Sequence, residues 1–222
     1  GIGDKQSDKF FSFYHLNGND TLDQSLQALG YHRDDISDVV LSHLHFDHCG
    51  GSIIRQGDKL VPAFENAIYW SNERHWKWAT EPNDREKASF LKENILPIQE
   101  SGQLAFIDRK ENLTQAVFPN MDVLFVDGHT DSMMLPHISY KGKTIVFMAD
   151  LLPSVGHIPL PYVMGYDTRP LITMEEKATF LDKAAAESYI LFMEHDSVNE
   201  CCTVMATEKG VRLKDTFSFS EI

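Results

Sequence analysis

The chemically richest segment of this chain is Ser42-His43-Leu44-His45-Phe46-Asp47-His48-Cys49-Gly50-Gly51, which directly follows the apolar run Val39-Val40-Leu41. Three imidazoles and one carboxylate within six residues can supply ligands to two adjacent metal ions. The single residue between His43 and His45 keeps both side chains on one face of an extended backbone, whereas Asp47 and His48 follow where the chain turns. The two glycines permit that turn. This spacing favours a metal site over a run of solvated histidines.

Three other segments show the pattern of an apolar strand followed by a potential ligand. The runs 121–126, 143–148 and 189–193 are followed by His129, Asp150 and His195. Sites in open α/β sheets lie at the carboxyl ends of strands. We therefore expect these three side chains to complete the ligand set that the loop begins.

The ordered set of motifs over residues 38–198 resembles the metallo-β-lactamase superfamily in its dinuclear hydrolase form. The resemblance implies an α/β fold, the four-layer αββα sandwich, in one domain over residues 1–222. It also implies two divalent metal ions, zinc by default, with manganese, iron or cobalt as alternatives. The implied ligands are His43, His45 and His129 for one ion and Asp47, His48 and His195 for the other, with Asp150 bridging both.

Two features of the chain depart from that family's pattern. Many relatives have His-Thr-Pro-Gly-His around the third motif, whereas His129 is followed here by Thr130-Asp131-Ser132-Met133. Those positions are not ligands in the family, so the departure concerns the geometry of the turn. The chain begins with Gly1-Ile2-Gly3, which resembles the end of the family's N-terminal hairpin region. We therefore expect an N-terminally incomplete domain that lacks its first strands.

The segments Gly165-Tyr166-Asp167 and His195-Asp196 resemble the branch that contains N-acyl-homoserine lactone lactonases and methyl parathion hydrolase-like enzymes. The implied function is hydrolysis of a lactone or small ester by a hydroxide that bridges the two ions. Asp47 is expected to orient this hydroxide and move its proton. Tyr162 is a second candidate catalytic residue, as a donor to the developing oxyanion.

Aromatic side chains near the motifs suggest an apolar substrate pocket. Trp70, Trp76 and Tyr166 are candidates for its walls, and ordinary core packing is the alternative for the two tryptophans. His15, His32, His75 and His137 have no motif partner and are expected to be structural or surface residues.

Other activities use a similar ligand set. A glyoxalase II-like thioesterase needs a C-terminal helical domain, but only residues 196–222 follow His195. A phosphotriesterase remains open. A flavodiiron-like or persulfide dioxygenase-like redox enzyme would bind iron, and the former needs a flavodoxin domain. A non-catalytic metal-binding module usually has a degraded ligand set, whereas all seven positions are filled here.

Composition limits the partners of the chain. A net charge of −13 over 222 residues disfavours nucleic acid, and no apolar run approaches the ~20 residues of a membrane span. We expect a small-molecule substrate and leave a homodimer open. Three cysteines do not make a disulfide framework, which favours a reducing, cytoplasmic location. Cys49 is expected to be a small buried side chain rather than a ligand.

Helices are expected in three places. Leu22, Leu26 and Leu29 share one helical face, which predicts a helix over 21–29 that ends at Gly30. A second is expected over 84–93. Thr173-Met174-Glu175-Glu176 has the pattern of a capping box and predicts a helix from there to about residue 186. The proline-rich segment 153–170 is expected to be one long loop near the site.

Overall fold

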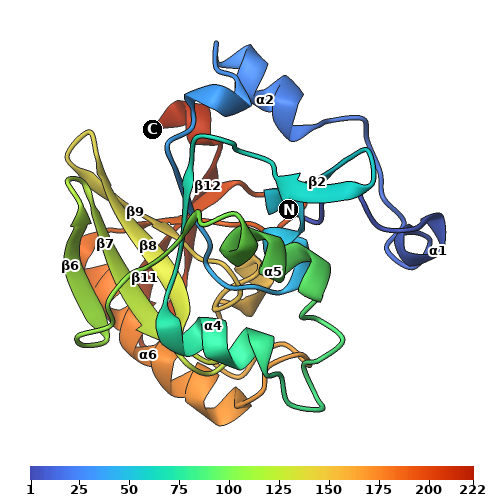
Figure 1. Ribbon diagram of the computed structural model, residues 1–222. Coiled ribbons are helices and arrows are strands. Elements are labelled where there is room, and N and C mark those ends of the chain that lie inside the picture. The colour runs from blue at the N-terminus through green and yellow to red at the C-terminus, as the bar shows by residue number, and fades with distance from the viewer. The chain divides into compact units, whose positions relative to one another are not determined.

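The chain contains both helices and strands in the computed structural model, which describes residues 1–222 (Figure 1). The expected α/β class is therefore confirmed. The chain divides into two units, Gly1–Ile107 and Asp108–Ile222, each with its own sheet and buried apolar cluster. The expectation of one domain over 1–222 stays a prediction, and the two units are described in turn.

The first unit is built on a parallel sheet with the strand order β1-β4-β5, in which β4 pairs with both neighbours. Its strands are β1 (Asp38–Val40), β4 (Ile68–Ser71) and β5 (Leu104–Phe106), and a separate hairpin joins β2 (Ile53–Gln56) to β3 (Lys59–Pro62). Its helices are α1 (Asp8–Phe11), α2 (Leu22–Ala28), α3 (Phe46–Cys49), α4 (Glu73–Thr80) and α5 (Lys92–Glu100), with short 3-10 turns η1 (Arg33–Asp35) and η2 (Gly50–Ser52). Leu44, Ile53, Tyr69 and Ile98 are completely buried in its core.

The second unit is built on a seven-stranded sheet with the order β12-β11-β10-β9-β8-β7-β6. The strands are β6 (Leu113–Phe118), β7 (Met121–Val126), β8 (Met133–Tyr140), β9 (Lys143–Phe147), β10 (Ile190–Phe192), β11 (Cys201–Thr207) and β12 (Gly210–Phe217). The helices are α6 (Pro170–Glu187) and the 3-10 turns η3 (Val155–His157) and η4 (Phe219–Glu221). The three apolar runs expected to be strands form β7, β9 and β10, so those predictions are confirmed.

Strand directions bring three segment ends to one edge of this sheet. β7 and β9 are both antiparallel to β8, and β9 is parallel to β10. The carboxyl ends of β7, β9 and β10 therefore point the same way. His129, Asp150 and His195 follow these three ends at distances of a few residues, and the sheet is the reason that they can meet.

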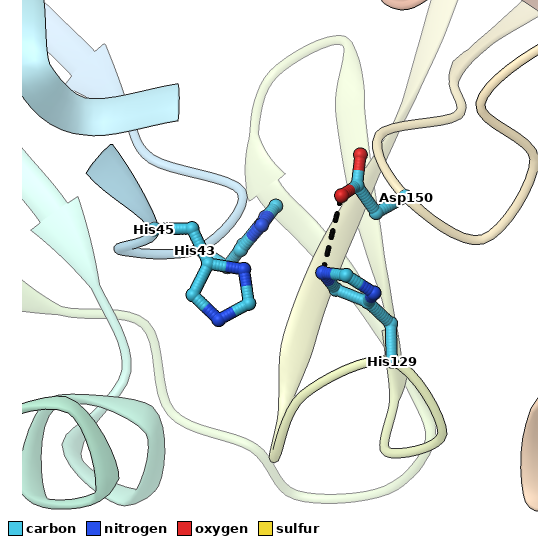
Figure 2. Close-up of side chains that lie close together, drawn as sticks. All are labelled: His43, His45, His129 and Asp150. Atoms are coloured by element: carbon cyan, nitrogen blue, oxygen red, sulfur yellow. Dashed lines mark ion pairs between the residues drawn. The ribbon is translucent and has the colours of Figure 1, made fainter. Parts of the chain in front are cut away.

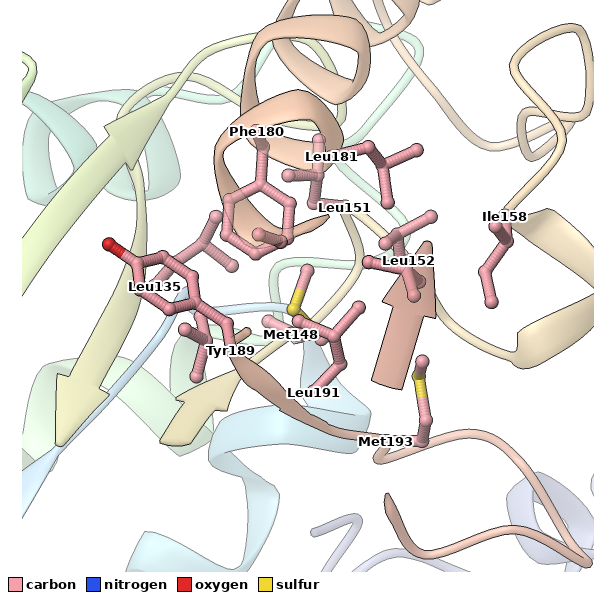
Figure 3. Packing of buried hydrophobic residues seen from close by; sticks show 14 of the residues in the cluster. Leu135, Met148, Leu151, Leu152, Ile158, Phe180, Leu181, Tyr189, Leu191 and Met193 are labelled. Carbon is pink, nitrogen blue, oxygen red and sulfur yellow. The ribbon is translucent and has the colours of Figure 1, made fainter. Parts of the chain in front are cut away.

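The core of the second unit lies between its sheet and α6 (Figure 3). Phe180 and Leu181 of α6 belong to the same buried cluster as Leu135, Met148 and Leu191 from the strands and their ends. Burial of such side chains contributes about 1.5–3 kcal/mol each. Met133, Met134 and Met148 are completely buried as well.

The helix predictions were partly right. α2 forms as expected, and Thr21 and Gln24 cap it reciprocally. The predicted helix over 84–93 is wrong: residues 84–89 form turns, and α5 begins only at Lys92. The turn is favoured because the Asn83 side chain accepts hydrogen bonds from the backbone nitrogens of Arg85 and Glu86.

The predicted capping box at Thr173 is also wrong. α6 begins three residues earlier, with Pro170 at its first turn, where the missing N–H of proline costs no hydrogen bond. The segment before it contains only the short turn η3, which agrees with the expected long loop. No helix in either unit has the length and hydropathy to cross a lipid bilayer.

Candidate functional site

The histidine-rich loop of the first unit, residues 42–48, follows β1 and runs into α3, which contains Asp47 and His48. His43, His45 and His48 are buried, whereas the Asp47 side chain is 35% exposed. The backbone nitrogen of Leu44 donates to Nε2 of His75 at 2.9 Å, and the Cys49 thiol donates to the carbonyl of Leu44 at 3.3 Å. The backbone of the loop is thus held at both the N–H and the carbonyl of Leu44.

The ring geometry of this loop brings donor atoms together. The ring centroid of His43 lies 4.7 Å from that of His45 and 3.9 Å from that of His48. Nε2 of His48 lies 3.5 Å from a carboxylate oxygen of Asp47. Figure 2 shows His43 and His45 leaving the same loop. Imidazoles packed this closely are a common arrangement for metal ligands.

Glu86 is a partner of this loop that the sequence did not reveal. Its carboxylate is 3% exposed and lies 3.4 Å from Nε2 of His45. Trp78 Nε1 and the Asn83 amide donate to the other carboxylate oxygen at 2.8 and 2.6 Å. A carboxylate held in this way orients the imidazole that it contacts and raises the basicity of the opposite nitrogen.

The second unit carries its candidate ligands on three strand ends. Nε2 of His129 lies 3.1 Å from one oxygen of Asp150, and Nε2 of His195 lies 3.1 Å from the other oxygen (Figure 2 shows the His129 pair). One carboxylate therefore faces two imidazoles, one on each oxygen. Two ligand atoms at zinc-ligand distances in a tetrahedral site are about 3.4 Å apart, so each pair has a separation close to that of two ligands of one ion.

His129 is oriented by a second carboxylate. Its Nδ1 lies 3.0 Å from Asp167, and both side chains are almost fully buried. The backbone carbonyl of His129 also accepts from the nitrogen and the hydroxyl of Thr168, each at 3.0 Å. With Nδ1 engaged by Asp167, Nε2 is the nitrogen that faces Asp150, as in the carboxylate-histidine pairs of metal sites.

The turn that carries His129 is held by charged side chains. Arg109 forms two hydrogen bonds with the carboxylate of Asp127, at 2.7 and 2.8 Å, and Asp127 accepts from the Ser132 nitrogen at 2.9 Å. Ser132 has a positive φ of 58°. At Gly128, a Cβ would overlap the backbone of Thr173 in α6. The altered residues after His129 thus form a turn with its own set of contacts.

The donor chemistry of both units fits borderline divalent ions. The candidates are imidazole nitrogens and carboxylate oxygens, each side chain offering one ligand atom, which suits zinc, manganese, iron and cobalt. Cys49 is not among them. Burial raises the pKa of its thiol to about 12, and its Sγ is used in the hydrogen bond to Leu44. The expected burial of Cys49 is confirmed.

The candidate pocket and catalytic aromatics occupy different environments. Trp76 is 7% exposed and lies in the core of the first unit. Trp70, on β4, donates from Nε1 to Asp38 at 2.8 Å. Tyr162 and Tyr166 are 61% and 80% exposed in the loop before α6. The proposed roles of all four stay predictions.

His75 was expected to be structural, and it is: it is completely buried and anchors the metal-binding loop through Leu44. A ring nitrogen that accepts a hydrogen bond carries no proton, so the proton of His75 is on Nδ1. No sequence signal links His75 or Glu86 to the loop, because neither belongs to a motif and both act through tertiary contacts.

Comparison with known proteins identifies relatives. The family described as the metallo-beta-lactamase superfamily matches residues 12–195. A search of curated proteins found no match. Among solved structures, a probable metal-dependent hydrolase from Staphylococcus aureus has a TM-score of 0.83 at 23% identity, covering 98% of this chain and 77% of that one.

Two further structures are a lactonase and a protein solved with an acyl-homoserine bound. AidC, a dizinc quorum-quenching lactonase, has a TM-score of 0.76 at 21% identity, covering 93% of this chain and 73% of its own. AiiA of B. thuringiensis, solved with N-decanoyl-L-homoserine at its active site, has a TM-score of 0.62 at 21% identity, covering 82% of this chain and 64% of its own. At these identities the likeness shows a shared fold.

Proposed function

Because the chain belongs to the metallo-β-lactamase superfamily, we propose that it is a dinuclear hydrolase that acts on a lactone or a small ester. The chain is a metal-dependent hydrolase of that superfamily; the count of metal ions and the substrate are the proposal. The observation that carries it is Asp150, whose two oxygens each face a different imidazole at 3.1 Å. A carboxylate in that arrangement is suited to bridge two ions.

The proposed ligand set combines the loop of the first unit with the strand ends of the second. His43, His45 and His129 would hold one ion, Asp47, His48 and His195 the other, and Asp150 both. Glu86 and Asp167 support the proposal, because each places a buried carboxylate against a proposed ligand histidine. Bound divalent ions, zinc by default, supply Lewis acidity and lower the pKa of water toward neutrality.

Asp47 is the proposed general base and acid. Its side chain is more exposed than that of His48, which it approaches. One carboxylate can therefore contact His48 and also a substrate that enters from solvent. It would hold the attacking water in position, accept its proton and return that proton to the leaving oxygen. We propose that Tyr162 donates a hydrogen bond to the substrate oxyanion and that Trp70, Trp76 and Tyr166 contact its apolar part.

The charge of the chain supports a small, uncharged substrate. A net charge of −13 repels polyanions such as RNA, although bound ions offset this within a Debye length of about 8 Å. The likeness to the fold of AidC and AiiA makes N-acyl-homoserine lactones the first compounds to test. We also propose a cytoplasmic location, which the three buried free thiols support.

The test combines metal analysis with a substrate panel. Elemental analysis of metal-replete protein is expected to give about two ions per chain. The panel comprises acyl-homoserine lactones of increasing chain length, a chromogenic ester, a thioester, a phosphotriester and a single-stranded RNA. We expect the fastest hydrolysis for a lactone or an ester. Faster cleavage of the phosphotriester or thioester would replace the substrate assignment, and a reproducible content of one ion or none would overturn the dinuclear site.

A further inference from the structure

α6 carries a lysine at a position where its neighbours are core residues. Lys177 is completely buried, one turn before the buried Phe180 and Leu181. Packing alone would favour leucine or methionine there, because burying an ammonium without partners is costly. Burial lowers the pKa of Lys177 to about 8, and the nearby carboxylate of Asp167 opposes this shift. A buried lysine at this position therefore requires hydrogen-bond partners that compensate for the loss of hydration.

The partners of Lys177 are backbone carbonyls of one segment. Nζ donates to the backbone carbonyls of His157 and Tyr162 at 2.7 and 2.6 Å, and it lies 3.3 Å from those of Pro159 and Leu160. An ammonium has three N–H groups, so four carbonyls of one segment share them. All four carbonyls belong to the loop that follows Asp150.

The sequence of this loop explains why it needs an outside donor. Residues 158–163 form no helix or strand, and Pro159 and Pro161 have no backbone N–H. The segment is thus rich in carbonyl acceptors and poor in donors. A single ammonium at its centre satisfies these carbonyls and fixes the backbone on which Tyr162 stands.

Glu176, the residue next to Lys177, holds another segment by accepting hydrogen bonds from its backbone N–H groups. The carboxylate of Glu176 accepts from the backbone nitrogens of Asp127 and Gly128, at 2.6 and 3.0 Å. Those two nitrogens open the turn that carries His129. Adjacent side chains of opposite charge on one helix therefore hold two different site segments, one through its N–H groups and one through its carbonyls.

We propose that Lys177 is a positioning residue that fixes the backbone of residues 157–162, and with it Tyr162, for substrate binding. Glu176 is its counterpart for the His129 turn. The part of the proposal that concerns substrate rests on the proposed function, whereas the part that concerns the loop does not. The two parts therefore require separate measurements.

The test compares Lys177→Met with Lys183→Met, the same substitution at a partly exposed position on the same helix. Hydrogen exchange of residues 155–165 is expected to be about 10-fold faster or more in Lys177→Met and unchanged in Lys183→Met. KM for the best lactone or ester is expected to rise about 10-fold, with metal content retained. Exchange and KM that match Lys183→Met would overturn the proposal.

Glu176→Gln tests whether the His129 turn and residues 157–162 are held independently. It is expected to accelerate exchange at Asp127 and Gly128 and loss of metal to a chelator, while the exchange of 157–162 stays unchanged. Acceleration of both segments in each variant would mean that α6 acts only as a general support, and it would also overturn the proposal. If the chain hydrolyses no member of the panel, the proposed function fails, but the exchange data still decide whether Lys177 fixes the loop.

A second variant covers the case in which Lys177→Met does not fold. Lys177→Gln keeps a side-chain amide with two N–H donors, and its exchange at 157–162 is expected to lie between the native protein and complete loss of protection. Native-like exchange in a folded Lys177→Gln would show that the ammonium is not needed and would contradict the proposal.

Discussion

The loop after β1 and the strand ends of the second unit present the same kinds of side chain by different routes. The loop places four candidate ligands within six residues, from His43 to His48, so local backbone geometry sets their spacing. In the second unit, His129, Asp150 and His195 are far apart in sequence, and the shared direction of β7, β9 and β10 brings them together. The first set depends on a turn and the second on a completed sheet.

The comparison predicts that the largest loss comes from the strand ends. Asp150→Asn removes a charge from the carboxylate that faces both His129 and His195. We expect the metal content to fall from about two ions to one or none, and kcat/KM to fall about 10³-fold or more. His48→Ala, on the loop, should remove one ion only. Asp131→Asn, whose carboxylate pairs with Arg169, is the control, and retention of two ions by Asp150→Asn would contradict the bridging role.

The next largest effect is expected on the loop. Asp47→Asn keeps the shape of the side chain but removes its capacity to accept and return a proton. Turnover should fall by about 10²–10⁴-fold with little change in KM, as for an interaction made in the transition state. Steady-state kinetics on metal-replete protein decide this. An unchanged kcat would remove Asp47 from proton transfer.

The buried carboxylates of Asp167 and Glu86 allow the histidines of the two units to be compared directly, because each contacts one candidate ligand. Asp167→Asn and Glu86→Gln should each weaken metal binding by about 10–100-fold, measured by competition with a chelator. We expect the larger effect for Asp167, because it lies 3.0 Å from His129 whereas Glu86 lies 3.4 Å from His45. The exposed Glu175→Gln on α6 is the control. Equal affinities in all three variants would show that neither carboxylate tunes a ligand.

The loop's anchor should affect stability more than catalysis. His75→Phe keeps a ring in the core but leaves the buried N–H of Leu44 without its acceptor. The free energy of unfolding should fall by about 1–3 kcal/mol, seen as a lower denaturation midpoint. His32→Phe at an exposed position is the matched control. A midpoint shift equal to that of the control would contradict the anchoring role.

The last effect appears only at alkaline pH and concerns buried thiols in both units. Burial raises the pKa of Cys49 and of Cys202 from 9.0 to about 12. Between these values the folded protein binds more protons than the unfolded chain, so the free energy of unfolding falls as the pH rises from 9 toward 12. Denaturation measured from pH 8 to 11 should show this decline, with a shallower slope in Cys49→Ala and Cys202→Ala. An unchanged slope in both variants would assign it to other groups.

The sequence predicted what depends on local pattern. The close packing of His43, His45 and His48, the strands β7, β9 and β10, and the helix α2 could be recognised, because each is a periodic or short-range signal. The beginning of α6 was misplaced, since proline at the first turn competes with a plausible capping box.

Other features could not be predicted because they arise from contacts between distant segments. Glu86 approaches His45 only because residues 84–89 turn instead of forming a helix. Lys177 interrupts the apolar face of α6, and its reason lies in carbonyls at residues 157–162. A pattern search treats such a lysine as an irregularity in the helix.

The close approach of Gly128 to Thr173 limits which positions are useful in directed evolution of this protein. Since a side chain at 128 would overlap the first turn of α6, a substitution there shifts both the helix and the turn that carries His129. Libraries that aim at new specificity therefore gain little from randomising position 128. The exposed residues between Pro159 and Tyr166 offer more freedom, because their side chains can vary while backbone carbonyls make the contacts to Lys177.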